Sequence, residues 1–328
     1  MHTKLCAYPL GSTDNSYDGP VRKEYPKTLM EFERWFRTEE SCRSYLANLR
    51  WPNKFCCPRC KHDQGWERSR GLWRCGKCRA DISPTAGTIF HGSHIPLRVW
   101  FRMVWSVTNQ KSGVSALGLQ RLLGLGSYET AWACLHKLRQ AMIRPGREAL
   151  SGKIEVDEVP VGGKARGNRA KAWRNGETKA IVVVAAEVRG DGIGRIRLMH
   201  VPDSTEDSLC GFVKSVAASG SEIITDGWRG YWGLEGTDYI YHPTTLRHKG
   251  KQASRAILPR VNRVASLLKR WLLGIHQGRA SKKHLGYYLD EFTFRFNRRL
   301  SAQRGMLFYR LLQQAVLIDP LPYAELIK

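Results

Sequence analysis

The 328-residue sequence contains no hydrophobic run long enough to cross a membrane. Its longest uncharged apolar stretch, residues 180–186, has seven residues, whereas a spanning helix needs about 18. Residues 1–20 also lack the apolar segment of a secretory signal peptide. We therefore expect a cytoplasmic protein that has no membrane partner.

Acidic residues are scarce: 29 Asp and Glu stand against 53 Lys and Arg, which gives a formal net charge of +24. The deficit is strongest between Tyr239 and Leu289, where there is no Asp or Glu but there are eleven Lys and Arg. An excess of this size favours a polyanionic partner, and we expect nucleic acid. The composition is otherwise that of an ordinary globular protein, with 42% hydrophobic residues, which excludes a disordered chain.

The nine cysteines are poor candidates for disulfides in a reducing compartment, so their spacing is better interpreted as metal ligation. Cys57 and Cys60 form one C-x2-C pair, Cys75 and Cys78 form another, and 14 residues separate the two pairs. Two such turns can close a tetrahedral four-sulfur zinc site without an open position, which is a structural site. Cys56 is an alternative ligand, although it breaks the two-residue spacing.

Helical periodicity flanks the cysteine pairs, over residues 28–49 and again over 96–108. From 112 to 142 the pattern predicts two helices separated by a Gly-rich break at Gly124, with Ser127 as the N-cap of the second helix. Two helices joined by a tight turn suggest a helix-turn-helix, whose second helix would lie in the DNA major groove. An ordinary helical connector is an equal alternative for this segment.

From Ser151 onward the pattern changes to strands, with one helix predicted over 205–218. Four apolar runs predict the strands: 153–156, 179–188, 194–201 and 222–225. Strand, strand, strand, helix, strand is the order of an RNase H-like fold. Asp157 and Asp226 would then end two strands that lie side by side, where paired carboxylates can hold the two Mg²⁺ ions of a phosphoryl-transfer site.

These changes of pattern divide the chain into six segments. They are an N-terminal tail 1–27, a helical segment 28–50, a zinc ribbon 51–85, a helical region 86–147 with the possible helix-turn-helix, a catalytic domain 148–315 and a C-terminal tail 316–328. The expected fold class is therefore an α/β RNase H-like catalytic domain preceded by a zinc ribbon and a helical, helix-turn-helix-like DNA-binding region.

Several segments together carry a resemblance to a known family. They are the run Glu155–Lys164 (EVDEVPVGGK), the strand end Thr225–Trp228 (TDGW), residues 258–274 (LPRVNRVASLLKRWLLG) and residues 289–299 (LDEFTFRFNRR). With the zinc ribbon and the segment Gly87–Phe90 (GTIF), they resemble the DDE transposases of bacterial insertion sequences. The similar group has an N-terminal zinc ribbon and a third catalytic position that can be Asn. The resemblance spans residues 28–315.

The resemblance implies a cut-and-join reaction on DNA, in which Asp157, Asp226 and Asn262 hold Mg²⁺ or Mn²⁺. Water would cut the end of the element, and the freed 3′ hydroxyl would attack the target DNA. Asn262 departs from the commonest pattern, because no acidic residue stands at the usual spacing after Asp226. Lys269 completes the catalytic set; it follows Asn262 by two helical turns on the same helix face, within reach of bound DNA.

Basic residues supply the expected phosphate contacts, which would make DNA binding strongly salt-dependent. They are Lys164, Arg166, Arg169 and Lys171 in the loop after the first strand, and Arg247, Lys249, Lys251, Arg255, Arg260, Arg263 and Arg270 in the acid-free segment. The resemblance implies that the partners are the terminal inverted repeats of the element, the target DNA and further copies of the chain on paired ends.

Three alternatives remain open at this level. Asp290 or Glu291, instead of Asn262, could complete the metal site. The chain could be a zinc-ribbon DNA-binding protein without catalysis, against which Asp157 and Asp226 argue. It could also be an RNase H-like nuclease without joining activity, since cutting and joining use the same metal ions.

Overall fold

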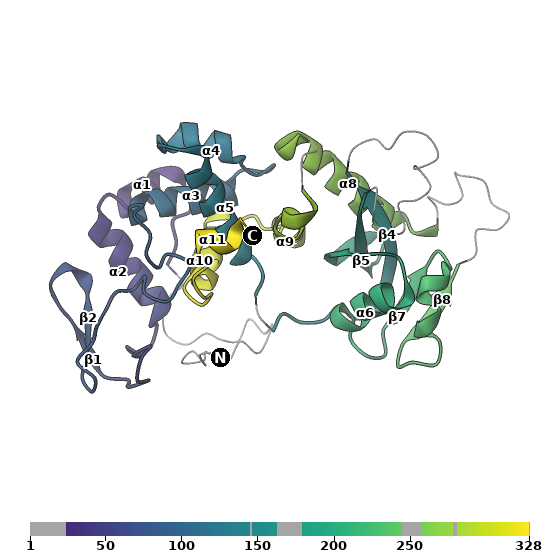
Figure 1. Cartoon of the computed structure of the whole chain (residues 1–328), viewed down its shortest axis with the longest axis horizontal. Coiled ribbons are helices and arrows are strands. Elements are labelled where there is room, and N and C mark those ends of the chain that lie inside the picture. The colour runs from purple at the N-terminus through teal and green to yellow at the C-terminus, as the bar shows by residue number, and fades with distance from the viewer. Residues whose placement is uncertain (1–23, 145, 163–178, 245–256, 278–280, 328) are drawn as a thin grey trace. The chain divides into compact units, whose positions relative to one another are not determined.

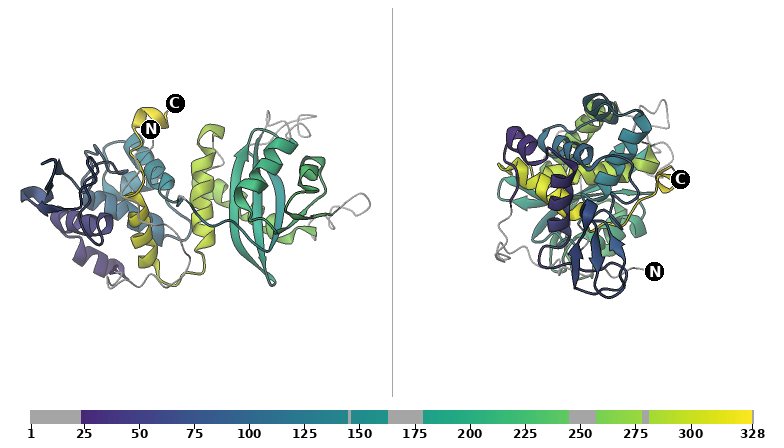
Figure 2. Two further views of the ribbon diagram at one scale, coloured as in Figure 1. Left: turned by 90° about the horizontal axis from the view of Figure 1, so that it is seen from below. Right: turned by 90° about the vertical axis from the view of Figure 1, so that its left-hand side faces the viewer.

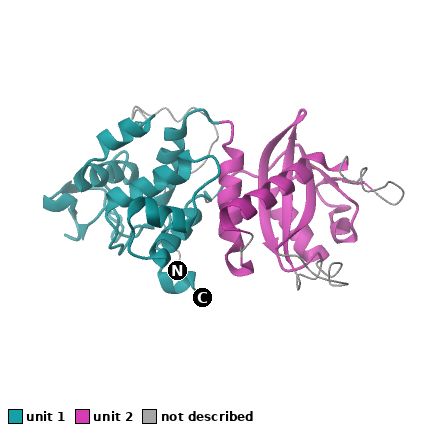
Figure 3. Cartoon of the chain, turned by 90° about the horizontal axis from the view of Figure 1, so that it is seen from above, with its two compact units in different colours: residues 1–146, 301–328 teal, residues 147–300 magenta. Residues whose placement is uncertain are grey.

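The computed structural model describes residues 24–144, 146–162, 179–244, 257–277 and 281–327. The chain forms two compact units (Figure 3). Unit 1 consists of residues 1–146 and 301–328, and unit 2 consists of residues 147–300. No helix within the described ranges is long and apolar enough to cross a membrane.

Unit 1 combines helices with a small sheet (Figure 1). Its helices are α1 (Leu29–Trp35), α2 (Glu39–Arg50), α3 (Leu97–Asn109), α4 (Ala116–Leu123), α5 (Tyr128–Gln140), α10 (Arg304–Ala315) and α11 (Tyr323–Leu326). The sheet contains β1 (Gly65–Glu67), β2 (Trp73–Cys75) and β3 (Asp81–Ile82), all antiparallel, with a short 3-10 helix η1 (Ser69–Gly71) between β1 and β2. The helices before and after the cysteine pairs confirm the helical periodicity that the sequence shows over residues 28–49 and 96–108.

Side-chain caps fix where these helices begin. The Thr28 side chain accepts a hydrogen bond from the N–H of Glu31, and Thr38 forms a capping box with Ser41 at the start of α2. Ser127 caps α5 by accepting from the N–H of Thr130, as the sequence predicts. Gly124 ends α4 with a φ of 64°, which is the left-handed conformation that glycine adopts without strain.

An aromatic core holds the helices of unit 1 together. The ring centroids of Phe32 and Trp105 are 4.8 Å apart, as are those of Phe36 and Phe101, and each such pair adds about 0.5–1.5 kcal/mol beyond area burial. Phe308 of α10 joins this core, with its ring 5.5 Å from that of Phe32. The C-terminal helices therefore fold with the N-terminal part of the chain.

This packing differs from the sequence-based boundaries 148–315 and 316–328. The structure places α10 in unit 1, where it packs against α2 and α3, and α11 beside α5. The physical reason is that the apolar side of α10 is buried by aromatic residues from far earlier in the chain. A periodic apolar pattern shows that a helix has a buried face, but it does not show which residues cover that face.

Unit 2 contains a five-stranded mixed sheet with helices on both faces (Figure 2). Its strands are β4 (Lys153–Val161), β5 (Ala180–Arg189), β6 (Gly192–Val201), β7 (Glu222–Thr225) and β8 (Ile240–Pro243). Their order is β6-β5-β4-β7-β8; β5 is antiparallel to β4 and β6, and β7 is parallel to β4 and β8. The four predicted strands are present in the predicted order along the chain, but the first is longer than expected and β8 was not predicted.

The two faces of this sheet have separate cores. On one face, α6 (Glu206–Val216) and the 3-10 helix η4 (Arg229–Leu234) pack against alternate residues of the central strands, including Ile154 and Val156. On the other face, α8 (Pro259–His276) and α9 (Leu285–Asn297), which follows the 3-10 turn η5 (Lys282–His284), pack against Val159 and Val161. Because side chains alternate along a strand, Glu155 and Asp157 point to the face of the sheet against which α8 packs.

Candidate functional site

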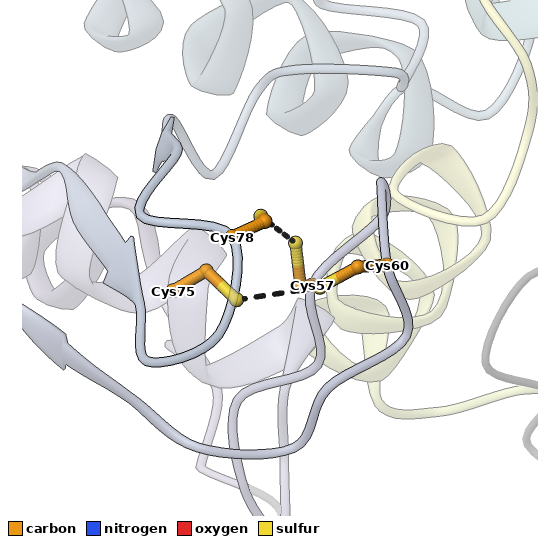
Figure 4. Close-up of side chains that lie close together, drawn as sticks. All are labelled: Cys57, Cys60, Cys75 and Cys78. Atoms are coloured by element: carbon orange, nitrogen blue, oxygen red, sulfur yellow. Dashed lines mark hydrogen bonds between the residues drawn. The ribbon is translucent and has the colours of Figure 1, made fainter.

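Unit 1 contains a four-cysteine cluster that fits one zinc ion. The Sγ atoms of Cys57 and Cys78 are 3.6 Å apart, and those of Cys60 and Cys75 are 3.5 Å apart (Figure 4). All four sulfur atoms lie within 4.8 Å of one another. Tetrahedral ligation with Zn–S bonds near 2.3 Å requires sulfurs about 3.8 Å apart, so the donor set matches zinc in type, number and separation. The four ligands are those that the sequence spacing predicts.

The two cysteine pairs have the same backbone geometry. The N–H of Cys57 donates to the carbonyl of His62 and the N–H of Lys61 donates to the carbonyl of Cys57. Cys75 and Arg79 repeat these bonds in the second pair, and Lys61 and Arg79 have left-handed φ values of 61° and 58°. Each turn therefore aims two thiols at one point.

The local environment favours the ionised form of Cys75. Although burial opposes ionisation, hydrogen bonds from the backbone N–H groups of Cys78 and Lys77 lower the pKa of the Cys75 thiol to about 6. A thiolate is the form of cysteine that binds a metal ion.

Unit 2 contains a cluster of three carboxylates, from Asp157, Glu158 and Asp226. One oxygen of each lies within 4.8 Å of the others. Asp226 directly follows β7, as the sequence predicts, and β7 pairs in parallel with β4 through Glu155. Three negative charges at this separation repel one another, so a bound cation would stabilise the cluster. The donor set consists of hard oxygen ligands, which suits Mg²⁺ or Mn²⁺.

Asp157 does not end its strand, contrary to the sequence-based expectation. β4 continues to Val161 and remains paired with β5 as far as Ala180. The shorter prediction arose because Glu158 and Pro160 interrupt the apolar pattern. Pro160 is tolerated because the described pairing with β7 stops at Glu155, which leaves this part of β4 as an edge on that side.

Glu158 is a member of the cluster that sequence reasoning missed. Its side chain is buried, with the residue 5% exposed, and its Oε2 accepts a hydrogen bond of 3.1 Å from the hydroxyl of Tyr231. Burial raises the pKa of Tyr231 well above its ordinary value, and the charges of Glu158, Asp157 and Asp226 add to the shift. Tyr231 therefore stays protonated and remains a donor. An acidic residue inside an apolar strand was the signal available in the sequence.

The turn after β7 holds Asp226 in place. Asp226 Oδ1 accepts a hydrogen bond of 2.9 Å from the N–H of Trp228, and Thr225 Oγ1 accepts one of 3.2 Å from the N–H of Gly227. Gly227 has a φ of 75°, a conformation that a residue with a Cβ rarely adopts. These contacts fix one oxygen of Asp226 within the turn.

Glu155 connects the central strand to the start of α8, and sequence reasoning gave it no role. It is 2% exposed, and its Oε2 accepts hydrogen bonds from the N–H groups of Arg260 at 2.7 Å and Val261 at 3.0 Å. Its Oε1 lies 3.1 Å from Nη1 of Arg260. A carboxylate at a helix N-terminus is favourable because it satisfies N–H groups that have no partner within the helix.

Asn262 and Lys269 both lie on α8, seven residues apart. Leu258 is the N-cap of this helix, so Asn262 does not cap it; its Nδ2 donates to the carbonyl of Leu258 at 2.9 Å. Burial lowers the pKa of Lys269, Lys179 lowers it further, and Asp157 opposes the shift. Lys269 therefore lies within electrostatic range of the carboxylate cluster.

The alternative acids on α9 have other surroundings. Glu291 is fully buried and its Oε1 lies 2.8 Å from Nη2 of Arg295, one helical turn away. Burial raises the pKa of Asp290 to about 7, and Arg147 opposes that shift. Among the described residues, the carboxylates that gather around Asp157 are those of Glu158 and Asp226.

Most of the expected DNA contacts lie outside the described residues: Lys164, Arg166, Arg169, Lys171, Arg247, Lys249, Lys251 and Arg255. Arg260 is described, and its guanidinium is engaged with Glu155 and with the carbonyl of Gly190 at 2.8 Å. Arg263 and Arg270 are exposed on α8. They occupy the side of α8 opposite its buried residues, at positions where a phosphate contact is sterically open.

Comparisons with known proteins match the part of the chain that carries the four-cysteine cluster and the part that carries the carboxylate cluster. Residues 37–81 match the model of a transposase zinc-ribbon domain. Residues 149–297 match the model of the ISXO2-like transposase domain, a domain of IS1595 transposases. The first range includes all four zinc ligands, and the second includes the carboxylate cluster and α8. Together the two ranges cover more than half of the chain.

A curated relative supports the same family. The chain is 26% identical over 276 residues to an uncharacterized protein in transposable element ISH50 of Halobacterium salinarum, an alignment that covers 79% of this chain and 91% of that protein. No solved structure matches the chain. The zinc-ribbon match and the four-cysteine geometry together identify a structural zinc site, and the transposase domains make DNA the partner. The chain belongs to the IS1595 family of insertion-sequence transposases.

Proposed function

We propose that this transposase cleaves the ends of its insertion sequence and joins them to target DNA by metal-dependent phosphoryl transfer. The observation that carries the proposal is the cluster of Asp157, Glu158 and Asp226, whose oxygens lie within 4.8 Å of one another. Asp157 and Glu158 lie on β4, and Asp226 directly follows the neighbouring strand β7. In the sheet order β6-β5-β4-β7-β8, β5 alone runs antiparallel to the other four strands. This order and these directions support an RNase H-like fold for unit 2.

The overall reaction consists of two substitutions at phosphorus. In the first, the oxygen of water bonds to the phosphorus at the element's end, the bond from phosphorus to the 3′ oxygen breaks, and one proton of the water ends on that 3′ oxygen. In the second, the freed 3′ hydroxyl bonds to a phosphorus of the target, and a target 3′ oxygen leaves with the proton. Two Mg²⁺ ions, when bound, would lower the pKa of the attacking hydroxyl and stabilise the charge on the leaving oxygen.

The carboxylate cluster and two residues of α8, Asn262 and Lys269, would hold the metal ions and the substrate. Asp157 and Asp226 supply charged oxygens, and Asn262 Oδ1 supplies a neutral one, because its Nδ2 is engaged with Leu258. Lys269 binds an oxygen of the scissile phosphate, and its positive charge offsets the charge that develops during transfer. Glu158 supports the cluster from its buried side through Tyr231.

DNA binding is distributed over both units. In unit 1, a hollow of about 470 Å³ is lined by four arginines, Arg34, Arg37, Arg98 and Arg102, and by two glutamates, Glu31 and Glu33. The excess of guanidinium groups over carboxylates suits phosphate oxygens. Helix α5 exposes Tyr128 at its start, the end that a helix-turn-helix inserts into the major groove, while its centre is buried. In unit 2, Arg263 and Arg270 are exposed on α8 and supply further phosphate contacts. We infer that copies of the chain act together on paired ends.

A cleavage and joining assay tests the proposed function. Full-length chain is incubated with Mg²⁺, a labelled duplex that carries the element's terminal inverted repeat, and a supercoiled target plasmid. We expect a free 3′ end at the element boundary, followed by covalent joining to the plasmid. Specific binding without cleavage in Mg²⁺ or Mn²⁺ would contradict catalysis, and cleavage without a joined product would identify a nuclease.

Replacing Asn262 by Ala is expected to slow cleavage by at least about tenfold, roughly 1.4 kcal/mol, because the neutral third donor is lost. Asn262→Asp is expected to retain appreciable activity, since it supplies an oxygen at a similar place. Single-turnover cleavage of the labelled duplex measures both rates.

Glu158→Gln and Glu291→Gln test the two acids that could be the third metal ligand in place of Asn262. Their cleavage rates are compared only if their thermal stability equals that of the wild type. If Asn262→Ala cleaves at the wild-type rate while one of them is inactive and folded, that acid is the third ligand and the assignment of Asn262 is wrong.

Glu155→Gln is expected to raise the Mg²⁺ concentration that half-saturates cleavage by about tenfold, the range seen when an outer partner of a metal ligand is changed. The physical reason is that Glu155, two residues before Asp157 on β4, accepts hydrogen bonds from the N–H groups at the start of α8, the helix that carries Asn262. A Mg²⁺ titration of the cleavage rate measures the effect.

Arg260→Gln is the matched control, because it removes the ion pair with Glu155 but leaves the backbone bonds to the helix. It should keep a Mg²⁺ requirement close to that of the wild type. An unchanged Mg²⁺ requirement in folded Glu155→Gln would show that the carboxylate only stabilises the fold.

A further inference from the structure

A groove of about 660 Å³ lies beside the turn that carries Asp226. Two tryptophans, Trp228 and Trp232, line it together with Arg229, Ser204, Asp203 and Glu206. Its volume is within the range of small-molecule sites, about 300–1,000 Å³. The mechanism derived above gives this groove no role.

Hydrogen bonds connect the segment that lines the groove to the carboxylate cluster. The backbone N–H of Trp228 donates to Asp226 Oδ1 at 2.9 Å, and its indole Nε1–H donates to the carbonyl of Ser204 at 3.1 Å. The same η4 segment supplies Tyr231, which donates to Glu158. A ligand in the groove would therefore lie next to the site where the scissile phosphate binds.

Trp232 is unusually accessible for a tryptophan, with 57% of its surface exposed. Trp228 is half-buried, and the guanidinium of Arg229 lies 5.5 Å from its ring centroid. The hydroxyl of Ser204, a residue only 6% exposed, has no hydrogen-bond partner among the described residues. An exposed indole in the lining of a groove offers an aromatic face on which a flat ring can stack.

The charges in the groove exclude a phosphate as the main ligand. Two carboxylates, from Asp203 and Glu206, face one guanidinium, from Arg229. Asp203 Oδ1 is engaged, because it accepts hydrogen bonds from the Thr205 backbone and side chain and from Ser208. Glu206 supplies the second carboxylate of the lining. A carboxylate repels a phosphate but accepts hydrogen bonds from the amino groups of bases.

We propose that the groove binds a nucleobase of the DNA strand next to the scissile phosphate, displaced from the helical stack and placed against Trp232. The proposal rests on the proposed function, since it takes the DNA end as the substrate of the neighbouring carboxylates. Stacking of one base on an aromatic side chain contributes about 1–3 kcal/mol, which is comparable to the cost of unstacking a base. Displacing one base would also open the backbone around the phosphate that is cut.

The experiment measures whether Trp232 and one particular base act together. In the cleavage-deficient Asp157→Asn background, affinities are measured for terminal-repeat duplexes in which each of the positions flanking the cleaved bond is made abasic in turn. We expect Trp232→Ala to weaken binding of the intact duplex by about tenfold and to lose that effect when one specific position is abasic. Such non-additivity identifies a direct pair.

Two further variants separate stacking from folding. Trp232→Phe should restore most of the affinity, because it keeps an aromatic face, and Tyr323→Ala, which removes a similarly exposed ring from α11, should leave it unchanged. A Trp232→Ala effect that is equal on intact and all abasic duplexes, or no effect at all, would overturn the groove assignment.

The same experiment separates this proposal from the proposed function. Cleavage by the wild-type chain with no base-specific effect of Trp232 would leave the function standing and remove the groove. A base-specific effect of Trp232 in a chain that never cleaves would leave the groove standing as a DNA-binding site and remove the catalytic function.

Discussion

Replacing Asp157 or Asp226 by Asn is expected to lower the rate of DNA cleavage in Mg²⁺ by at least about a thousandfold, which corresponds to roughly 4 kcal/mol of transition-state stabilisation. Each change keeps the shape of the side chain but removes one negative charge from a cluster whose oxygens lie within 4.8 Å of one another. Divalent ions bind carboxylate oxygens far better than amide oxygens when the site carries few charges. Single-turnover cleavage of a terminal-repeat duplex measures the loss.

Binding of the terminal-repeat duplex should remain close to that of the wild type in both variants. Affinity for DNA comes mainly from Lys and Arg contacts with phosphates, whereas the metal ligands act in the chemical step. Asp191→Asn is the matched control, because Asp191 is an exposed aspartate at the turn between β5 and β6 of the same sheet. Cleavage by Asp157→Asn or Asp226→Asn at more than about a tenth of the wild-type rate would remove that residue from the catalytic set.

The parts of the site that follow from local sequence pattern were predicted well. The apolar run before Asp226 predicts a buried strand that ends there, and the structure has β7 from Glu222 to Thr225. The neighbouring strand was predicted too short, because a proline in an apolar pattern suggests that a strand has ended. Periodicity cannot show that Pro160 is paired with β5 while the described pairing of β4 with β7 stops at Glu155, an arrangement in which proline is tolerated. The expectation that Asp157 ends its strand was therefore wrong.

Contacts between distant segments could not be predicted in this way. Glu155 meets the backbone of Arg260, 105 residues later in the chain, and nothing in either segment alone indicates the other. Glu158 follows Asp157 directly, so strand alternation assigns it to the opposite face, yet its carboxylate joins the cluster. The length of the Glu158 side chain and the turn after β7 bring these oxygens together. The alternation of apolar and polar residues along the sequence does not reveal either feature.

The zinc ligands were easier to predict than the carboxylate cluster for a physical reason. Each C-x2-C turn is local, and its geometry depends on a few backbone bonds such as that from Lys61 to Cys57. The carboxylate cluster depends instead on the pairing of β4 with β7, which are separated by two strands and a helix. A short-range motif therefore fixes a metal site more reliably than residues that depend on the fold to meet.

Removing the zinc, or replacing Cys60 by Ser, is expected to unfold the ribbon while unit 2 stays folded. The buried core of the ribbon consists of Phe55, Cys57, Cys75 and Ile82, and two of these four are themselves zinc ligands. So small a core cannot offset the loss of chain entropy, whereas zinc binding by such sites contributes an apparent 10–16 kcal/mol, roughly, at pH 7.

The measurements for this prediction are zinc content per chain, protease sensitivity within residues 51–85 and affinity for the terminal-repeat duplex. Wild-type chain should contain one zinc, and Cys60→Ser should lose it, become cleavable in the ribbon and bind DNA more weakly. Cys134→Ser, which changes a buried thiol on α5 outside the cluster, should keep its zinc and its resistance to protease. Because a closed four-sulfur site supplies folding energy and no chemistry, Mg²⁺ binding by unit 2 should be unchanged in Cys60→Ser. Wild-type chain without zinc, or Cys60→Ser that retains zinc and an intact ribbon, would show that these four cysteines do not form the site.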